Sequence, residues 1–184
     1  MDIKLSTRNL LVATLLTTAG SAIAADPSSC EAVNLSDVGW TDITATTAAT
    51  SLVLKGLGYS PKVNVLSVPV TYKSLETGDI DVFLGNWMPT MEGDLAAYRD
   101  AGTVEVIQPA NLLGAKYTLA VNKKASDAGL KTFADIAKFK DQLDGEIYGI
   151  EPGNDGNRII LEMINDNAFG LEGFKVIESS EQGM

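Results

Sequence analysis

The stretch GDIDVFLGNWMP, residues 78–89, decides the fold class of this 184-residue chain. Its apolar half, residues 82–84, is almost continuous, which is typical of a parallel strand covered on both faces. We expect this strand to occupy residues 79–85, and Pro89 suits the first turn of a helix that continues through Tyr98. Parallel strands require crossover helices, so the stretch predicts an α/β fold.

The chain before this stretch alternates between strand-like and helix-like segments. Strands are predicted at residues 33–38 and 63–68, and a short helix at residues 72–76 is stopped by Gly78. A longer helix lies between the two strands, with Asp42 as its expected N-cap and Gly58 as its C-terminal stop. Its apolar positions recur at three and four residues: Ile43, Ala45, Ala49, Leu52, Val53 and Leu57.

The chain after the stretch continues the same alternation. Strands are predicted at residues 104–107, 116–121, 146–150 and 174–177, and helices at residues 132–143 and 157–165. Thr132 and Asp135 imitate a capping box at the start of the first of these helices. A sheet with right-handed crossovers follows, in which ligands gather outside the carboxyl ends of the strands.

Composition excludes several classes of function. The chain has no histidine and one cysteine, which argues against histidine-dependent nucleophiles, most zinc sites and an internal disulfide. Lysine and arginine total 14 against 24 aspartate and glutamate, a net charge of −10. Nucleic-acid binding is disfavoured, because affinity for phosphate backbones comes largely from basic residues. We therefore expect no metal and no nucleic-acid partner.

The first 24 residues have the pattern of a secretory signal peptide. Lys4 and Arg8 precede an apolar run at residues 10–19, and Ala22-Ile23-Ala24 forms a cleavage site, with the cut expected after Ala24 or Ala25. The run is about half the ~20 apolar residues that a membrane span needs. The mature chain is thus expected to be exported to a bacterial periplasm, with no span of its own. Lone Cys30 is unusual in such an oxidising compartment and suggests a partner outside this chain.

Three aromatic residues fall at strand ends or at a crossover: Trp40, Trp87 and Tyr117. Each one taken alone is more often a core residue, but their joint placement favours an aromatic box around a cleft. A quaternary ammonium donates no hydrogen bond, so it is recognised through ring faces, and a desolvated cation–π contact contributes about 2 kcal/mol. The pattern therefore indicates a binding site for such a cation.

Four separated motifs carry a family resemblance in their order and spacing. They are DVGWTD at residues 37–42, the stretch at 78–89, AKYTL at 115–119 and YGIEPGNDGN at 148–157. Together they resemble the glycine betaine and choline family of periplasmic substrate-binding proteins of ABC importers. The resemblance covers nearly the whole mature chain. It implies a two-lobe Venus flytrap of the type II periplasmic-binding-protein class, with a first lobe at residues 25–115 and the start of a second at residues 116–184. It also implies a C-terminal part that this chain lacks.

The resemblance also implies the site and the partners. Trp40, Trp87 and Tyr117 match the family's cage positions, and Asp42 and Asn154 match its hydroxyl-binding pair. Because Asp42 accepts a hydroxyl and repels a carboxylate, choline is favoured over glycine betaine. Asp42 could instead be only a helix cap, and Asn154 could bind only its own backbone. The implied partners are a permease and its ATPase, the implied state is a monomer, and no cofactor is expected.

Other interpretations remain open at this point. Glycine betaine or acetylcholine could be the ligand within the same class. An exported hydrolase could use the carboxylates of Asp79, Asp81 or Asp155, although Asp79 and Asp81 also suit a turn and a sheet edge. The chain could also be the sensor lobe of a receptor, which downstream sequence would distinguish from a transport protein.

Overall fold

Five strands form two separate parallel sheets in residues 26–184, the part of the chain that this computed structural model describes. The first sheet has the order β2-β1-β3 and the second pairs β4 with β5. The strands are β1 (Ala32–Asp37), β2 (Ser60–Val65), β3 (Val82–Phe83), β4 (Glu146–Tyr148) and β5 (Lys175–Ile177). The α/β fold class is confirmed, whereas the predicted signal peptide lies outside the described residues.

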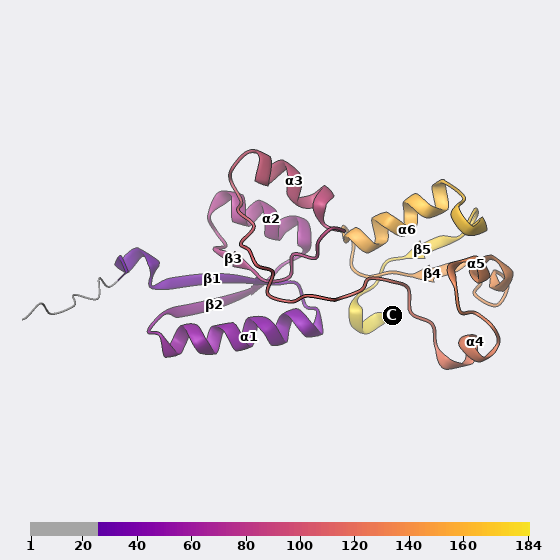
Figure 1. Ribbon diagram of the computed structural model, residues 1–184, viewed down its shortest axis with the longest axis horizontal. Coiled ribbons are helices and arrows are strands. Elements are labelled where there is room, and N and C mark those ends of the chain that lie inside the picture. Colours follow the sequence, from indigo (N-terminus) through magenta and orange to yellow (C-terminus); the bar gives the residue numbers. More distant parts are fainter. Residues whose placement is uncertain (1–25) are drawn as a thin grey trace, which may run out of the picture.

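Helices connect the parallel strands (Figure 1). The α-helices are α1 (Thr41–Gly56), α2 (Val68–Thr77), α3 (Glu92–Asp100), α4 (Lys123–Asp127), α5 (Phe133–Ile136) and α6 (Asp155–Asn165). Short 3₁₀ turns are η1 (Ser28–Cys30), η2 (Ala137–Phe139), η3 (Ala168–Gly170) and η4 (Glu181–Gly183). We call the part from η1 to α3 the N-terminal unit and the part from α4 to η4 the C-terminal unit.

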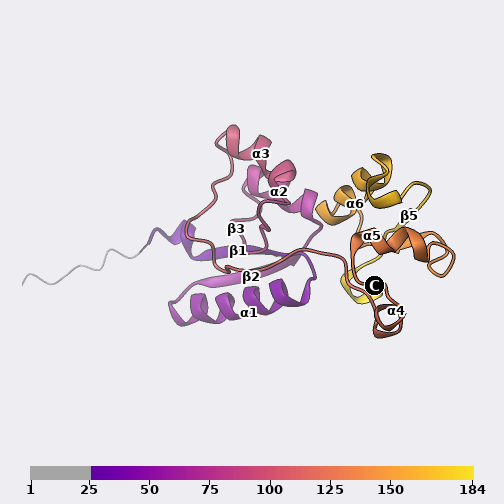
Figure 2. The ribbon, with the colours of Figure 1, turned by 45° about the vertical axis from the view of Figure 1, so that its right-hand side comes forward.

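The N-terminal unit has three layers. β1 lies in the middle of its sheet, with Ala32 to Asp37 in register with Ser60 to Val65 of β2 on one side and Leu35 opposite Val82 of β3 on the other. Helix α1 covers one face of this sheet, and α2 and α3 lie on the opposite face (Figures 1 and 2). Because the three strands are parallel, their carboxyl ends all point toward the C-terminal unit (Figure 1).

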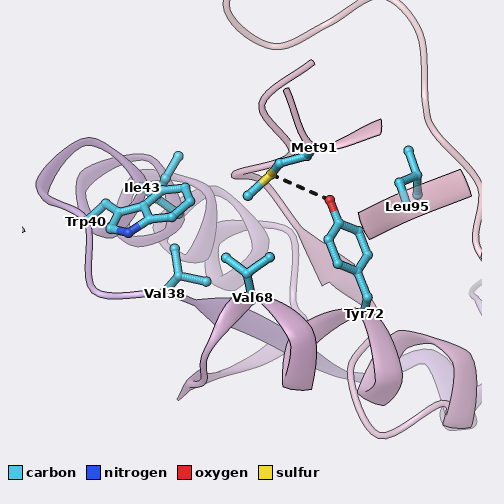
Figure 3. Close-up of a cluster of buried hydrophobic side chains, with 7 residues drawn as sticks. All are labelled: Val38, Trp40, Ile43, Val68, Tyr72, Met91 and Leu95. Carbon is cyan, nitrogen blue, oxygen red and sulfur yellow. Dashed lines mark hydrogen bonds between the residues drawn. The ribbon is translucent and has the colours of Figure 1, made fainter. Parts of the chain in front are cut away.

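A buried cluster joins the segment after β1 to helices α1, α2 and α3 (Figure 3). Within this cluster Tyr72 is 2% exposed and stacks on Tyr98 with 6.0 Å between the ring centroids. Its hydroxyl donates to Asn86 Oδ1 at 2.8 Å. Burial raises the pKa of this phenol, so it remains a donor at neutral pH. The cluster comprises Val38, Trp40, Ile43, Val68, Tyr72, Met91 and Leu95.

Helix α1 packs differently from the sequence prediction. Its buried residues are Ile43, Thr47 and Ser51, whereas Leu52 and Val53 are 70% and 63% exposed. The expected apolar face is therefore wrong beyond Ile43. Small hydroxyl-bearing side chains allow this helix to approach the sheet closely, and most of its large apolar residues lie on the other side.

The two ends of α1 were predicted with different success. Trp40 occupies the N-cap position, and Asp42 lies inside the first turn, so the prediction of Asp42 as the cap was wrong. At the other end, Gly58 has φ +97°, its amide donates to the carbonyl of Lys55, and Tyr59 N donates to the carbonyl of Leu54. This is the Schellman arrangement, and it confirms Gly58 as the stop.

The C-terminal unit has its own core beneath α6. Ile147 on β4, Ile160 on α6 and Phe174 before β5 are buried together with Leu130, Ile136 and Leu171. The capping box at Thr132 and Asp135 is present at the start of α5, as predicted. Strands β4 and β5 pair in parallel from Glu146–Lys175 to Tyr148–Ile177, which confirms both predicted strands in shortened form.

Several predicted element boundaries were wrong. Residues 104–107 and 116–121 form no strand, because no described strand pairs with them, although Val104 and Val106 pack against the first core. The predicted strand at 63–68 ends at Val65, since Val68 already begins α2 with Pro69 in its first turn. Strand β3 is limited to Val82–Phe83, and the helix after Pro89 begins only at Glu92.

Candidate ligand-binding site

The candidate site lies where the carboxyl ends of β1 and β4 face each other across the two units. β1 ends at Asp37, whose Oδ1 accepts hydrogen bonds from Gly39 N at 2.8 Å and Thr44 Oγ1 at 3.1 Å. Gly39 has φ +82°, a conformation that glycine adopts without strain, and this turn places Trp40 directly before α1. The loop after β4 carries Glu151 and Asn154 toward the same point.

Trp40 connects the N-terminal unit to the C-terminal unit. Its side chain is 9% exposed and belongs to the first core, which agrees with the core interpretation of this residue taken alone. Its indole Nε1–H nevertheless points away from the core and donates to both oxygens of Glu151, at 3.1 and 3.2 Å. The ring therefore serves as a core residue and as a contact across the junction.

Trp87 and Tyr117 form a pair of neighbouring rings. Their centroids are 6.5 Å apart with an interplanar angle of 32°, and the Tyr117 side chain is about half exposed. Trp87 follows β3, and Tyr117 lies on the exposed segment that leads from α3 to α4. Partial burial, together with the negative charges of Asp155 and Glu151, raises the pKa of Tyr117 to about 12. The phenol is therefore neutral at physiological pH, and its ring keeps a negative face.

Asn154 connects these rings to the C-terminal unit. It is 2% exposed and is the N-cap of α6, with Oδ1 accepting from Gly156 N at 2.7 Å. The same Oδ1 accepts from the Tyr117 hydroxyl at 3.3 Å, and Nδ2 donates to Glu151 Oε1 at 3.0 Å. Asn154 does bind its own backbone, as one interpretation expected, but it also contacts two side chains of the candidate site.

Asp42 is not brought into these contacts. Its side chain is exposed on the first turn of α1, and among the described residues its carboxylate makes no hydrogen bond. Trp40, Trp87, Tyr117 and Asn154 thus lie in one connected group, whereas Asp42, two residues after Trp40, forms no hydrogen bond to any of them through its carboxylate.

Two acidic residues of the site were not assigned to it from the sequence. Glu151 accepts from both Trp40 and Asn154, and its only sequence signal is its place in the same motif as Asn154. Asp155 was considered only as a hydrolytic carboxylate. It is 2% exposed, and its Oδ2 has no hydrogen-bond partner among the described residues. Burial raises the pKa of this carboxyl group.

A second contact between the units lies beside α3. Arg158 Nη2 donates to Asp94 Oδ2 at 3.0 Å and to the carbonyl of Thr90 at 3.2 Å. A cavity of about 200 Å³ opens there, lined by Asp94 on one side and by Asn154 and Arg158 on the other. Together with Trp40–Glu151, this ion pair holds the two units at two separate points.

The arrangement is suited to binding a small cation. Neutral aromatic faces stand beside the carboxylates of Glu151 and Asp155, which is the environment that favours a desolvated positive charge. Residues 26–184 contain no group of three potential metal ligands. The carboxylates of the hydrolase alternative are dispersed: Asp81 accepts from Asn34 at the sheet edge, Asp79 accepts from Thr77, and Asp155 lies in the other unit.

Fold and site together define a substrate-binding protein of the periplasmic-binding-protein-like class. A family model described as the substrate-binding domain of ABC-type glycine betaine transport systems matches residues 31–184. The chain belongs to this family. In the described range, no helix has the length and apolar character required to cross a membrane.

Known relatives agree with this assignment. A solved ABC-transporter choline binding protein in complex with choline superposes with a TM-score of 0.81 at 62% identity, over 85% of this chain and 54% of that chain. The uncharacterized protein ORF1 of Chromohalobacter salexigens is 48% identical over 156 residues, 85% of this chain and 99% of its own length. The glycine betaine/carnitine transport binding protein GbuC of Listeria monocytogenes is 33% identical over 92 residues, 50% of this chain and 30% of its own length. The chain thus spans about half the length of the solved choline-binding structure.

Proposed function

We propose that this protein captures choline outside the cell and delivers it to a membrane permease and its ATPase, without catalysis. The observation that carries the proposal is the connected group Trp87–Tyr117–Asn154–Glu151–Trp40, which brings aromatic rings of the N-terminal unit and the linking segment together with a carboxylate of the C-terminal unit. The relative solved with choline supports this ligand. The family supports a periplasmic location, which would follow removal of residues 1–24.

In this proposal the two units belong to two lobes, with residues 25–115 in the first lobe and residues 116–184 in the second. Ligand contacts from both lobes bias an equilibrium between open and closed forms, and the closed form is the one that a permease would accept. The protein is proposed to act as a monomer and to require no cofactor.

Choline is proposed over glycine betaine because carboxylates surround the site and would repel a second carboxylate. Glu151 and Asp155 lie at the group itself, and Asp42 stands on the adjoining turn. Calorimetry should therefore give tighter binding for choline than for glycine betaine, with acetylcholine as a third ligand for comparison. Equal or reversed affinities would contradict the choice of ligand, and measurable hydrolysis of acetylcholine would revive the enzyme alternative.

Trp87 and Tyr117 provide a test of the aromatic contribution. Trp87→Leu keeps apolar bulk but removes the π system, so choline affinity should fall by about 1 to 2 kcal/mol, or roughly five- to thirty-fold. Tyr117→Phe keeps the ring and removes only the long hydrogen bond to Asn154, so its loss should be smaller. A choline titration followed by tryptophan fluorescence or calorimetry compares the three proteins. Wild-type affinity in Trp87→Leu would mean that Trp87 is only a core residue.

A further inference from the structure

Glu151 makes side-chain hydrogen bonds to two residues of the candidate site that come from different units. Both of its oxygens accept from the indole Nε1 of Trp40, and Oε1 also accepts from Nδ2 of Asn154 at 3.0 Å. Its side chain is only half-buried, so water competes for its oxygens once these donors leave. Glu151 is therefore placed to respond to the positions of both donors at once.

We propose that Glu151 is a positioning residue that sets the orientation of Trp40 and of the Asn154 amide together, and so determines affinity for the cation. This inference rests on the proposed function. An indole has one donor, so an acceptor on Nε1 fixes the direction in which the ring faces point. The same acceptor directs Asn154 Nδ2 toward itself, which leaves Oδ1 for Gly156 N and the Tyr117 hydroxyl.

The charge of Glu151 matters as well as its shape. Hydrogen bonds to an ionised acceptor are roughly twice as strong as those between neutral groups, so a glutamine of the same size would hold the indole less firmly. The carboxylate also adds negative potential next to the ring faces that a cation would contact. Glu151 is thus expected to contribute through ring orientation and through the local field.

Other contacts also join the two units near Trp40, so the role of Glu151 can be tested without breaking the junction between the units. Glu181 accepts from Thr41 N, and Gln182 Nε2 donates to the carbonyl of Gly39 at 3.1 Å, so the backbone on both sides of Trp40 is fixed by η4. Substitution of Glu151 should therefore release the indole without separating the units.

The first measurement needs no ligand. The chain has two tryptophans, so its ¹⁵N-correlated spectrum contains two indole N–H signals, and Trp40→Phe identifies the signal of Trp40. Glu151→Gln should shift the Trp40 indole proton upfield, because a weaker hydrogen-bond acceptor deshields the N–H proton less. Glu172→Gln is the matched control, since it removes one charge from an exposed residue of the same unit. Equal spectra for the two variants would overturn the proposed positioning.

The second measurement is a choline titration of wild type, Glu151→Gln, Trp40→Phe and the double variant. Glu151→Gln should weaken binding about tenfold, and Glu172→Gln should change it less than twofold. The double variant should bind choline at most about threefold more weakly than the weaker-binding single variant, because both substitutions remove the same Trp40–Glu151 contact and only the effects of Glu151 on Asn154 and on the local field are left to add. Wild-type affinity in Glu151→Gln, or fully additive losses, would overturn the inference.

Failure of the proposed function would have a different signature. If wild type bound no choline, the ligand assignment would be wrong. The indole signal would still decide whether Glu151 orients Trp40, because that measurement uses the free protein.

Discussion

Asp155 carries an energetic cost that its neighbours do not fully offset. Its Oδ2 is buried without a hydrogen-bond partner among the described residues, and burial raises the pKa of the carboxyl group. Because the folded-state pKa lies above the unfolded value, the ionised form destabilises the fold, and protonation at lower pH removes that cost.

Asp155→Asn should therefore raise the free energy of unfolding at pH 7, by about 1 kcal/mol after loss of the favourable charge at the start of α6. The difference between variant and wild type should shrink as the pH falls from 7 toward about 4, the ordinary range for aspartate. Urea unfolding of both proteins at several pH values measures this difference in the free energy of unfolding. A difference that grows on acidification would mean that the carboxylate is stabilised by contacts in the fold.

At the level of single residues, the sequence predicted the positions of the two tryptophans after strands but not the residue that caps α1. Both tryptophans follow strands, and the chain places them in one connected group with Tyr117 and Asn154. The capping role of Asp42 was wrong, because the chain turns at Gly39 and Trp40 takes the cap position, two residues earlier than predicted. The role of Glu151 depends on a donor more than one hundred residues away in sequence, and no local pattern shows that partner.

At the level of elements, the C-terminal end of α1 has two nearby glycines, Gly56 and Gly58, whose replacement by alanine should change stability in opposite directions. Gly56 is the last helical residue and Gly58 has φ +97°, and a Cβ at either position meets open space. Gly56→Ala should stabilise the protein by about 0.5 kcal/mol, since it restricts the unfolded chain at a helical position. Gly58→Ala should destabilise it by about 1 kcal/mol, since a side chain strains the left-handed conformation. Thermal unfolding of both variants measures the two signs, and equal effects would contradict this account of the helix end.

Elements with local signals were predictable, and those that depend on distant pairing were not. The apolar periodicity and the glycine stops predicted β1, α1, α6 and β5 to within a few residues. The capping box predicted the start of α5, but the helix expected to reach residue 143 ends at Ile136 and continues only as the 3₁₀ turn η2. Residues 104–107 and 116–121 have the same local alternation, but a strand requires a neighbour, and none of the described strands pairs with them. The inward face of α1 was also unpredictable, because close packing against the sheet selects Thr47 and Ser51 over larger apolar side chains.

For the whole molecule, the ion pair between Arg158 and Asp94 should contribute only modestly to the stability of the contact between the two units. Their side chains are 41% and 20% exposed, so solvent screens the pair, and Asp94→Asn should lower the free energy of unfolding by less than about 1 kcal/mol. The loss should diminish in 1 M salt, where the screening length is about 3 Å. Asp100→Asn, which removes a more exposed partner of Arg99 on the same helix, is the control. A loss independent of salt would assign the effect to the hydrogen bond instead of the charge.

The segment between α3 and α4 gives the junction a further property. Residues 107–118 are all exposed, and Lys116 offers trypsin a bond to cleave within them. One cut there would convert an intramolecular junction into a bimolecular equilibrium between two pieces of chain, whose dissociation constant would replace the effective concentration that the intact backbone supplies. Dilution of the cleaved protein would then measure directly how strongly the two units bind each other.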